Sequence, residues 1–225
     1  TGYYSIKNSN GEKEEVYIDK GDLAGLERIP LYAANARTKT FPLPAPGTIY
    51  SGDTRVVAGV IDVEGVGELD DGLLRDYYAW EWGNSLFVTL DPYWHSKAAT
   101  DGGVADQDSD RDNTWEVSIG DEQYLWMKKS LEESNAKFKF VFAHHVNGTG
   151  RGGVRGAHAL EWGGYNSKGG TWQFSDERPD WDVPIHQLMV ENDVTIFFQG
   201  HDHIYSREVL DGVVYQSVPN PADDK

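Results

Sequence analysis

The sequence predicts an α/β fold in which helices cover a sheet. Two short apolar runs, residues 138–143 and 194–198, have the composition of buried strands, and a segment with helical spacing precedes each of them. An alternation of strand and helix of this kind is typical of a sheet with helices on its faces. Because 225 residues suit one large domain and nothing repeats internally, we expect residues 1–225 to form a single domain, with residues 1–60 mostly in loops.

The first regular elements are expected after a proline-rich stretch. Proline alternates through residues 41–47, which forces an extended backbone and forbids a helix. Residues 77–82 and 85–90 are aromatic and β-branched runs separated by Gly83-Asn84, and both turn residues tolerate positive φ. The pattern predicts a hairpin.

An acidic loop, residues 101–113, follows this hairpin. Its alternating Asp residues resemble the opening of a calcium loop, but Arg111 and Val117 replace the Gly and the bidentate Glu of that motif. A solvated loop and a calcium-binding loop both remain open.

Two helices and a second hairpin complete the pattern. One helix is expected over residues 121–134, with Asp121 placed to cap it, and another begins near Pro184. The residues expected on their inward faces are Tyr124, Leu125, Lys128 and Leu131 in the first helix, and Ile185, Leu188 and Met189 in the second. Residues 204–209 and 213–217 flank an Asp-Gly pair, which predicts the closing hairpin.

Charge and composition exclude several classes of protein. The 20 Lys and Arg stand against 37 Asp and Glu, and the net charge of −17 argues against nucleic acid or an anionic membrane as the main partner. No apolar run approaches the roughly 18 residues of a membrane helix. The absence of Cys excludes disulfides and thiol nucleophiles. We therefore expect a small-molecule partner and make no prediction of the oligomeric state.

Histidines at the ends of two predicted strands carry the main chemical signal. His144 and His145 follow the first apolar run, and His201 and His203 follow the second. Strand carboxyl ends form the edge where ligands bind in open α/β sheets, and neutral imidazole is a common ligand of Zn, Fe and Mn. We predict that these side chains converge on a metal, with hydrogen-bonded surface histidines as the alternative.

The order of these motifs resembles the calcineurin-like metallophosphoesterases. A strand followed by His144-His145, and later a strand followed by Gly200-His201-Asp202-His203, is similar to the last two metal motifs of that family. The stretches YYAWEWGNSLFVTLDPYW and DGVVYQSVPNP are similar to bacterial members, and the resemblance covers about residues 40–220.

The resemblance implies a four-layer α/β/β/α sandwich with two metal ions, Zn, Fe or Mn, at the rim of the sheets. The family also supplies Asp-x-His, Gly-Asp and Gly-Asn-His motifs, which this sequence lacks; Gly21-Asp22 and Gly52-Asp53 are expected to have no strand before them. We therefore expect a fold that is incomplete at its N-terminus, with the missing motifs upstream of Thr1.

By the same resemblance, His144 and His201 would ligate one metal and His203 the other. A hydroxide held by the two ions would attack the phosphorus of a small phosphoester, either a monoester or a diester. His145 would contact the phosphate or protonate the leaving group.

A Gly-rich loop, residues 148–156, follows the first histidine cluster. Arg151 and Arg155 within it are expected to bind the phosphate of the substrate, because guanidinium groups match phosphate oxygens. A flexible surface loop is the alternative. Among the Trp residues, Trp162 and Trp172 are expected in loops that shape the substrate pocket, together with Trp94, whereas Trp80 and Trp82 share a strand face and are expected to pack inside.

These sequence features predict one of two alternative functions. The first is metal-dependent phosphoester hydrolysis at a binuclear centre, with this chain supplying the histidine ligands. The alternative is a non-catalytic metal- or glycan-binding domain, an inactive relative without the bridging carboxylate. The lack of Cys, the acidity and the similarity to bacterial members favour a secreted or periplasmic protein.

Overall fold

The computed structural model describes part of the chain, and the chain divides into two compact units. The described residues are 2–7, 13–18, 35–37, 40–41, 43–57, 72–91, 115, 118–144, 153–154, 156–166 and 170–220. The first unit is Thr1–Leu43 with Arg55–Leu74, and the second is Pro44–Thr54 with Arg75–Lys225. The single-domain expectation stays a prediction, because two compact units can belong to one domain.

The first unit contains two antiparallel strand pairs. β1 (Gly2–Lys7) pairs with β2 (Lys13–Ile18), and β4 (Val56–Val57) pairs with β5 (Gly72–Leu73). β1, β2 and β4 lie within residues 1–60, but much of that range lies outside the described residues, so its expected loop character stays a prediction. Lys and Glu fill the first half of β2, so the alternation of apolar and polar residues that marks a half-buried strand is weak there.

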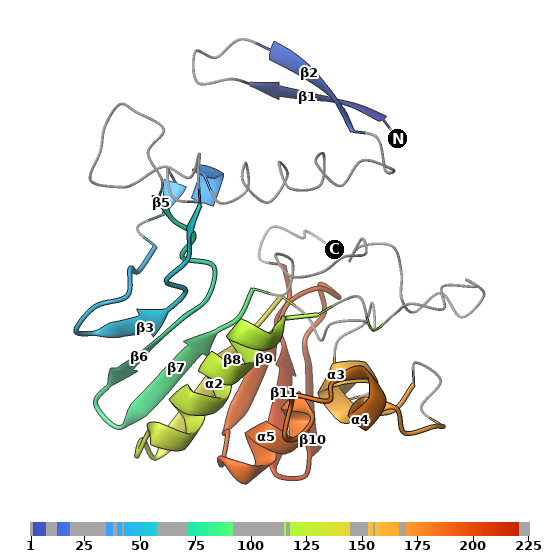
Figure 1. Cartoon of the computed structure of the whole chain (residues 1–225). Coiled ribbons are helices and arrows are strands. Elements are labelled where there is room, and N and C mark those ends of the chain that lie inside the picture. The colour runs from blue at the N-terminus through green and yellow to red at the C-terminus, as the bar shows by residue number, and fades with distance from the viewer. Residues whose placement is uncertain are drawn as a thin grey trace. The chain divides into compact units, whose positions relative to one another are not determined.

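The described strands of the second unit form one seven-stranded sheet (Figure 1). They are β3 (Tyr50–Gly52), β6 (Tyr78–Trp82), β7 (Ser85–Thr89), β8 (Phe138–Phe142), β9 (Ile196–Gln199), β10 (Ser206–Leu210) and β11 (Val213–Ser217). Their order across the sheet is β10-β11-β9-β8-β7-β6-β3. Pairing is parallel from β7 through β8 and β9 to β11, and antiparallel for β3–β6, β6–β7 and β10–β11. Consequently β3, β7, β8, β9 and β11 all end at the same side of the sheet, which we call the carboxyl edge.

Helices lie across one face of this sheet (Figure 1). They are α2 (Asp121–Glu133), the 3₁₀ helix η2 (Gly156–His158), α3 (Leu160–Gly163), α4 (Phe174–Glu177) and α5 (Ile185–Glu191). The buried core between the helices and the sheet includes Val88, Val141, Phe197 and Tyr215 from the strands and Tyr124, Met127, Leu131, Trp162, Ile185, Leu188 and Met189 from the helices. The predicted α/β class is confirmed.

Both predicted hairpins are present. β6 and β7 join through Gly83, whose φ of 61° is the left-handed conformation expected of that turn. β10 and β11 join through Asp211 and Gly212, with φ of 47° and 92°. Positive φ at both central residues matches the right-handed twist of the flanking strands.

Helix α2 spans nearly the predicted range, but its N-cap residue and its buried face differ from the prediction. Gly120 occupies the N-cap position, and the Asp121 carboxylate accepts a hydrogen bond from Trp181 Nε1 (2.7 Å) in place of capping the helix. Leu125 is 55% exposed, whereas Met127 is fully buried. The inward stripe is therefore shifted along the helix from the predicted one.

The sheet face opposite the helices carries a row of half-buried aromatic rings. Neighbouring centroids lie 6.0 Å apart for Tyr50 and Trp80, 4.9 Å for Trp80 and Phe87, and 5.4 Å for Phe87 and Phe140. Phe198 continues the row on β9, 6.3 Å from Phe140.

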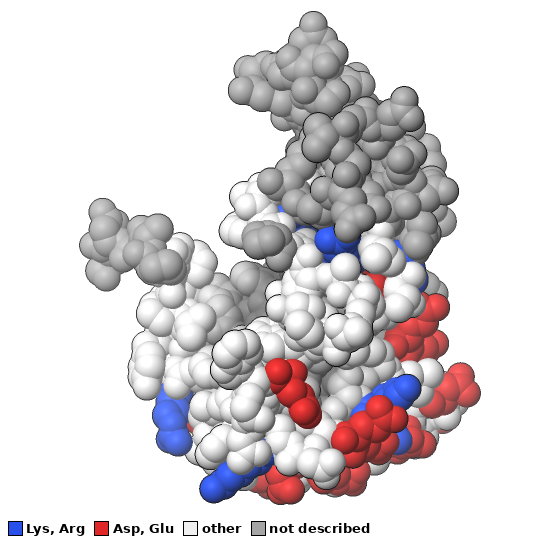
Figure 2. Space-filling view, turned by 90° about the vertical axis from the view of Figure 1, so that its left-hand side faces the viewer, with Lys and Arg blue, Asp and Glu red and all other residues white. Residues whose placement is uncertain are grey.

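In Figure 2 the acidic side chains gather mainly at the lower right, and much of the remaining described surface is uncharged.

Candidate functional site at the carboxyl edge

The predicted histidine clusters follow two neighbouring parallel strands. β8 pairs with β9 so that Phe142 lies opposite Phe198, and both strands end at the carboxyl edge. The pairing continues past the strands, since Ala143 N–H donates to Phe198 O (3.1 Å) and Gly200 N–H donates to His144 O (2.8 Å). The backbone therefore brings the residues that follow β8 and β9 side by side.

The imidazoles of His144 and His201 meet at this edge. His144 Nε2 lies 3.1 Å from His201 Nδ1, and the two rings are nearly perpendicular, with an interplanar angle of 83°. Partial burial lowers the pKa of His144, and the nearby His201 and His203 lower that pKa further. The neutral imidazole, which is the form that binds metals, is favoured at this position.

The separation of the two nitrogens matches the geometry of two imidazoles bound to one ion. Metal–nitrogen bonds of about 2.0–2.1 Å at angles between octahedral and tetrahedral values put two ligating nitrogens roughly 2.8–3.4 Å apart. The 3.1 Å between His144 Nε2 and His201 Nδ1 falls in this range. The separation therefore fits two ligands of a shared metal ion, and it equally fits a hydrogen bond between the two imidazoles, so both interpretations stay open.

His203 lies on the same turn but is not grouped with the other two histidines. Its N–H donates to Gly200 O (3.2 Å), its φ is 55°, and its side chain is exposed. Within the ranges that the structure describes, no three or more His, Asp or Glu side chains form a group arranged to hold a metal ion. His144 and His201 are thus brought together, and a third ligand is not among the described residues in this arrangement.

Three of the predicted site residues lie outside the described residues. They are His145, Arg151 and Arg155. The acidic loop at 101–113 and Trp94 also lie outside the described residues, so the calcium interpretation and the place of that Trp stay predictions.

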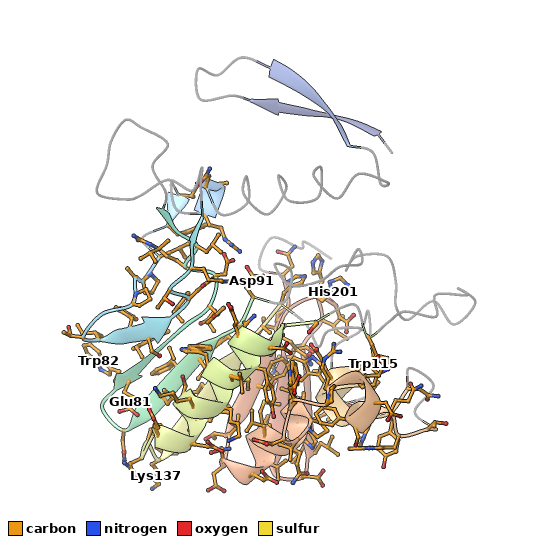
Figure 3. All side chains as sticks on the ribbon, viewed as in Figure 1. Glu81, Trp82, Asp91, Trp115, Lys137 and His201 are labelled. Atoms are coloured by element: carbon orange, nitrogen blue, oxygen red, sulfur yellow. The ribbon has the colours of Figure 1, made fainter. Side chains whose placement is uncertain are left out.

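Two acidic side chains at the carboxyl edge were missed by sequence reasoning. Asp91 follows β7, the strand next to β8, and its side chain is buried. Figure 3 places Asp91 at the same edge of the sheet as His201, whereas Glu81 and Lys137 lie at the opposite edge. An Asp directly after the apolar run 85–90 is the signal that could have identified it.

Asp53 is the second of these acidic residues, and it corrects a prediction. Gly52-Asp53 was expected to lack a preceding strand, but β3 leads directly into it. The side chain of Asp53 is fully buried, and its N–H donates to Tyr77 O (2.9 Å). A strand of three residues is too short to show a hydrophobic period, which explains the error.

Helix α2 holds the backbone of Asp91 in place. The Asp91 N–H donates to Gln123 Oε1 (2.8 Å), and Gln123 Nε2 donates to Asp91 O (2.7 Å) and to Ile119 O (3.0 Å). The side chain of Gln123 is fully buried. Its amide bonds to the Asp91 N–H and C=O groups in place of a neighbouring strand, because Asp91 follows the end of β7.

The buried and exposed tryptophans are not all those that the sequence predicts. Trp162 is fully buried on α3 and lines no surface pocket, whereas Trp172 is 47% exposed. Trp80 packs in the aromatic row, as predicted, but Trp82 is 79% exposed at the end of β6. The prediction for Trp162 and that for Trp82 are therefore wrong.

The search for relatives finds no family model that matches the chain and no matching curated protein. Among the described residues, none of the helices has the length and apolar character needed to cross a membrane.

Proposed function

We propose that this chain is the histidine-bearing part of a metal-dependent phosphoester hydrolase. The pairing of His144 and His201 carries the proposal, because the 3.1 Å between their nitrogens matches the spacing of two ligands on one ion. The resemblance of the motif order to calcineurin-like metallophosphoesterases supports the same reaction class. A small phosphoester is the proposed substrate.

The residues of the carboxyl edge have distinct roles in this proposal. His144 and His201 hold a divalent or trivalent ion such as Zn, Fe or Mn, and His203 contributes to a second one. When bound, the ions supply charge stabilisation of phosphoryl oxygens and activation of water. Asp91 follows β7, the strand next to β8, and adds an acidic side chain to the edge, which offsets the repulsion that neutral imidazoles alone leave between two cations.

The proposal extends to the second layer of the fold. A four-layer sandwich requires that a second sheet pack against the face opposite the helices, at a distance of about 10 Å. The row of aromatic rings from Tyr50 to Phe198 supports this arrangement, because a half-buried aromatic face is the kind of surface that a facing sheet covers.

Hydrolysis by the purified protein tests the proposal. After loading with Zn, Mn or Fe, we expect turnover of p-nitrophenyl phosphate or of bis(p-nitrophenyl) phosphate, and we expect His201→Ala to abolish it. His158→Ala is the matched control, because His158 is an exposed histidine on η2 and is not a member of the His144–His201 pair. Turnover in His201→Ala equal to that of the control would contradict the proposal.

A further inference from the structure

We propose that Tyr165 and Trp172 form a stacking site for a neutral carbohydrate. The two residues lie opposite each other in the segment between α3 and α4. Their rings meet edge to face, with centroids 5.3 Å apart and an interplanar angle of 83°. This inference is independent of the metal site and of the proposed hydrolase activity.

The backbone holds the two rings in position. Tyr165 bridges to Ala159 on one side and to Trp172 on the other. Leu160 N–H donates to Tyr165 O (2.6 Å), and Gln173 N–H donates to Gly164 O (2.9 Å). The two aromatic residues are therefore fixed to α3 by hydrogen bonds.

The indole of Trp172 is also fixed by direct contacts. Gly164 has a φ of 87°, and a Cβ added to it would lie 2.3 Å from Trp172 Cζ3, so only glycine lets the ring rest against the backbone. On another side, Trp172 Nε1 donates to Ser175 Oγ (3.3 Å). The ring is thus oriented before any ligand arrives, which reduces the entropy lost on binding.

Both rings remain accessible in spite of these contacts. Trp172 is 47% exposed and Tyr165 is 39% exposed. A large aromatic side chain that is held rigidly and left in water forgoes the free energy of burial that a packed ring gains. A ligand that covers the exposed ring surfaces would gain this free energy of burial on binding.

The surroundings favour a neutral sugar over other ligands. A sugar ring offers a face of C–H groups to an aromatic ring and hydroxyl groups at its edge. Asp176 and Glu177 are exposed on α4, shortly after Trp172 in the sequence, and carboxylate oxygens accept hydrogen bonds from hydroxyl groups. The acidic first turn of α4 disfavours an anionic ligand at this position. Two rings are also far smaller than the roughly 1,000 Å² that a stable protein interface requires.

Affinity electrophoresis tests the site with the full chain. Native gels contain soluble xylan, galactomannan, hydroxyethyl cellulose or pullulan, and retardation reports binding. We expect retardation of the wild type in at least one gel, and a loss of affinity of roughly tenfold or more in Trp172→Ala. Trp82→Ala is the matched control, because Trp82 is a more exposed Trp outside this site, and it should migrate like the wild type.

Further variants keep the test decisive. If circular dichroism shows that Trp172→Ala is unfolded, Tyr165→Ala removes the second ring without disturbing the contact with Gly164, and it should also weaken retardation. Absence of retardation of the wild type in every gel would overturn the proposal. Equal losses in Trp172→Ala and Trp82→Ala would also overturn it, as would binding to immobilised adenosine in place of the polysaccharides.

Discussion

His144 and His186 lie beside the same sheet, but different partners surround their rings. His186 on α5 is buried, with Nδ1 2.8 Å from Tyr215 Oη and Nε2 3.1 Å from Asp211 Oδ2. His144 is exposed at the carboxyl edge, and its Nε2 faces a nitrogen of His201. A phenol and a carboxylate satisfy both nitrogens of His186 within the protein. The nitrogens of His144 and His201 lie within hydrogen-bond distance of each other, and the same separation suits two ligands of one cation.

The two histidines differ in their partners, and we expect this difference to separate a structural role from the proposed metal-binding role. The hydrogen bonds of His186 connect α5 to β11 and to the turn before it, so its loss should affect folding. The pair at the carboxyl edge is accessible and contributes little to the core, so its loss should affect metal binding. The following predictions test this separation.

The largest expected effect is on metal affinity in His144→Ala. Removing one of two paired ligands should weaken binding of Zn by more than about 100-fold, since each ligand supplies several kcal/mol in protein zinc sites. Isothermal titration after treatment with a chelator measures the affinity. The metal-free variant should unfold at the same urea concentration as the wild type, and His186→Ala should bind Zn normally. Normal zinc affinity in His144→Ala would remove the basis of the comparison.

The next effect is on stability in His186→Ala. The substitution leaves the buried Tyr215 hydroxyl without its imidazole partner and opens a cavity, so we expect a loss of about 2 kcal/mol in the free energy of unfolding. Urea unfolding with chelator present measures it. A stability equal to that of the wild type would show that the hydrogen bonds of His186 are not structural.

A smaller effect is expected on substrate affinity in Arg151→Ala. If the Gly-rich loop binds phosphate, loss of one charged hydrogen bond should raise KM for a phosphoester by roughly tenfold, with a smaller change in kcat. Steady-state kinetics on the metal-loaded protein give both constants. An unchanged KM would show that Arg151 does not bind the phosphate of the substrate.

The smallest effect concerns the pH dependence of stability. Burial lowers the pKa of His186 below its ordinary value of 6.5, and the hydrogen bond and charge of Asp211 only partly oppose this, while His158 adds to it. The unfolded chain therefore binds a proton more readily than the folded protein. The stabilisation is complete above about pH 6.5 and is lost as the pH falls through the folded pKa.

Urea midpoints at pH 8, 6.5 and 5 in the presence of chelator check this sign. The wild type should lose stability on acidification, with a further contribution from the lowered pKa of His144. His186→Ala should show a flatter profile than the wild type. A steeper profile in this variant would contradict the assigned direction.

The sequence predicted those parts of the fold that bury long apolar runs. The strands β8 and β9 are nearly all apolar, and histidine follows each of them, so both the strands and the meeting of His144 with His201 were predictable. The hairpins were predictable because Gly83-Asn84 and Asp211-Gly212 tolerate positive φ.

Other features depend on contacts that a sequence pattern does not contain. Asp91 became a site candidate only from the sheet order, because β7 lies next to β8. Asp53 follows β3 at the same edge of the sheet, three strands from β8. Leu125 was expected to be buried because several apolar residues of α2 share a helical period, and the position of the sheet decides which of them face it. Trp162 was expected in a loop because α3 has only four residues, too few to show a helical period.

X-ray absorption spectroscopy at the zinc absorption edge tests most directly whether His144 and His201 bind a metal ion. Zinc-loaded wild-type protein should show scattering from imidazole rings with Zn–N distances of about 2.0–2.1 Å, and His201→Ala should lose part of that imidazole signal. His186→Ala should keep it in full. An unchanged imidazole signal in His201→Ala, or zinc bound by oxygen ligands alone in the wild type, would contradict the assignment of the carboxyl edge as a metal site.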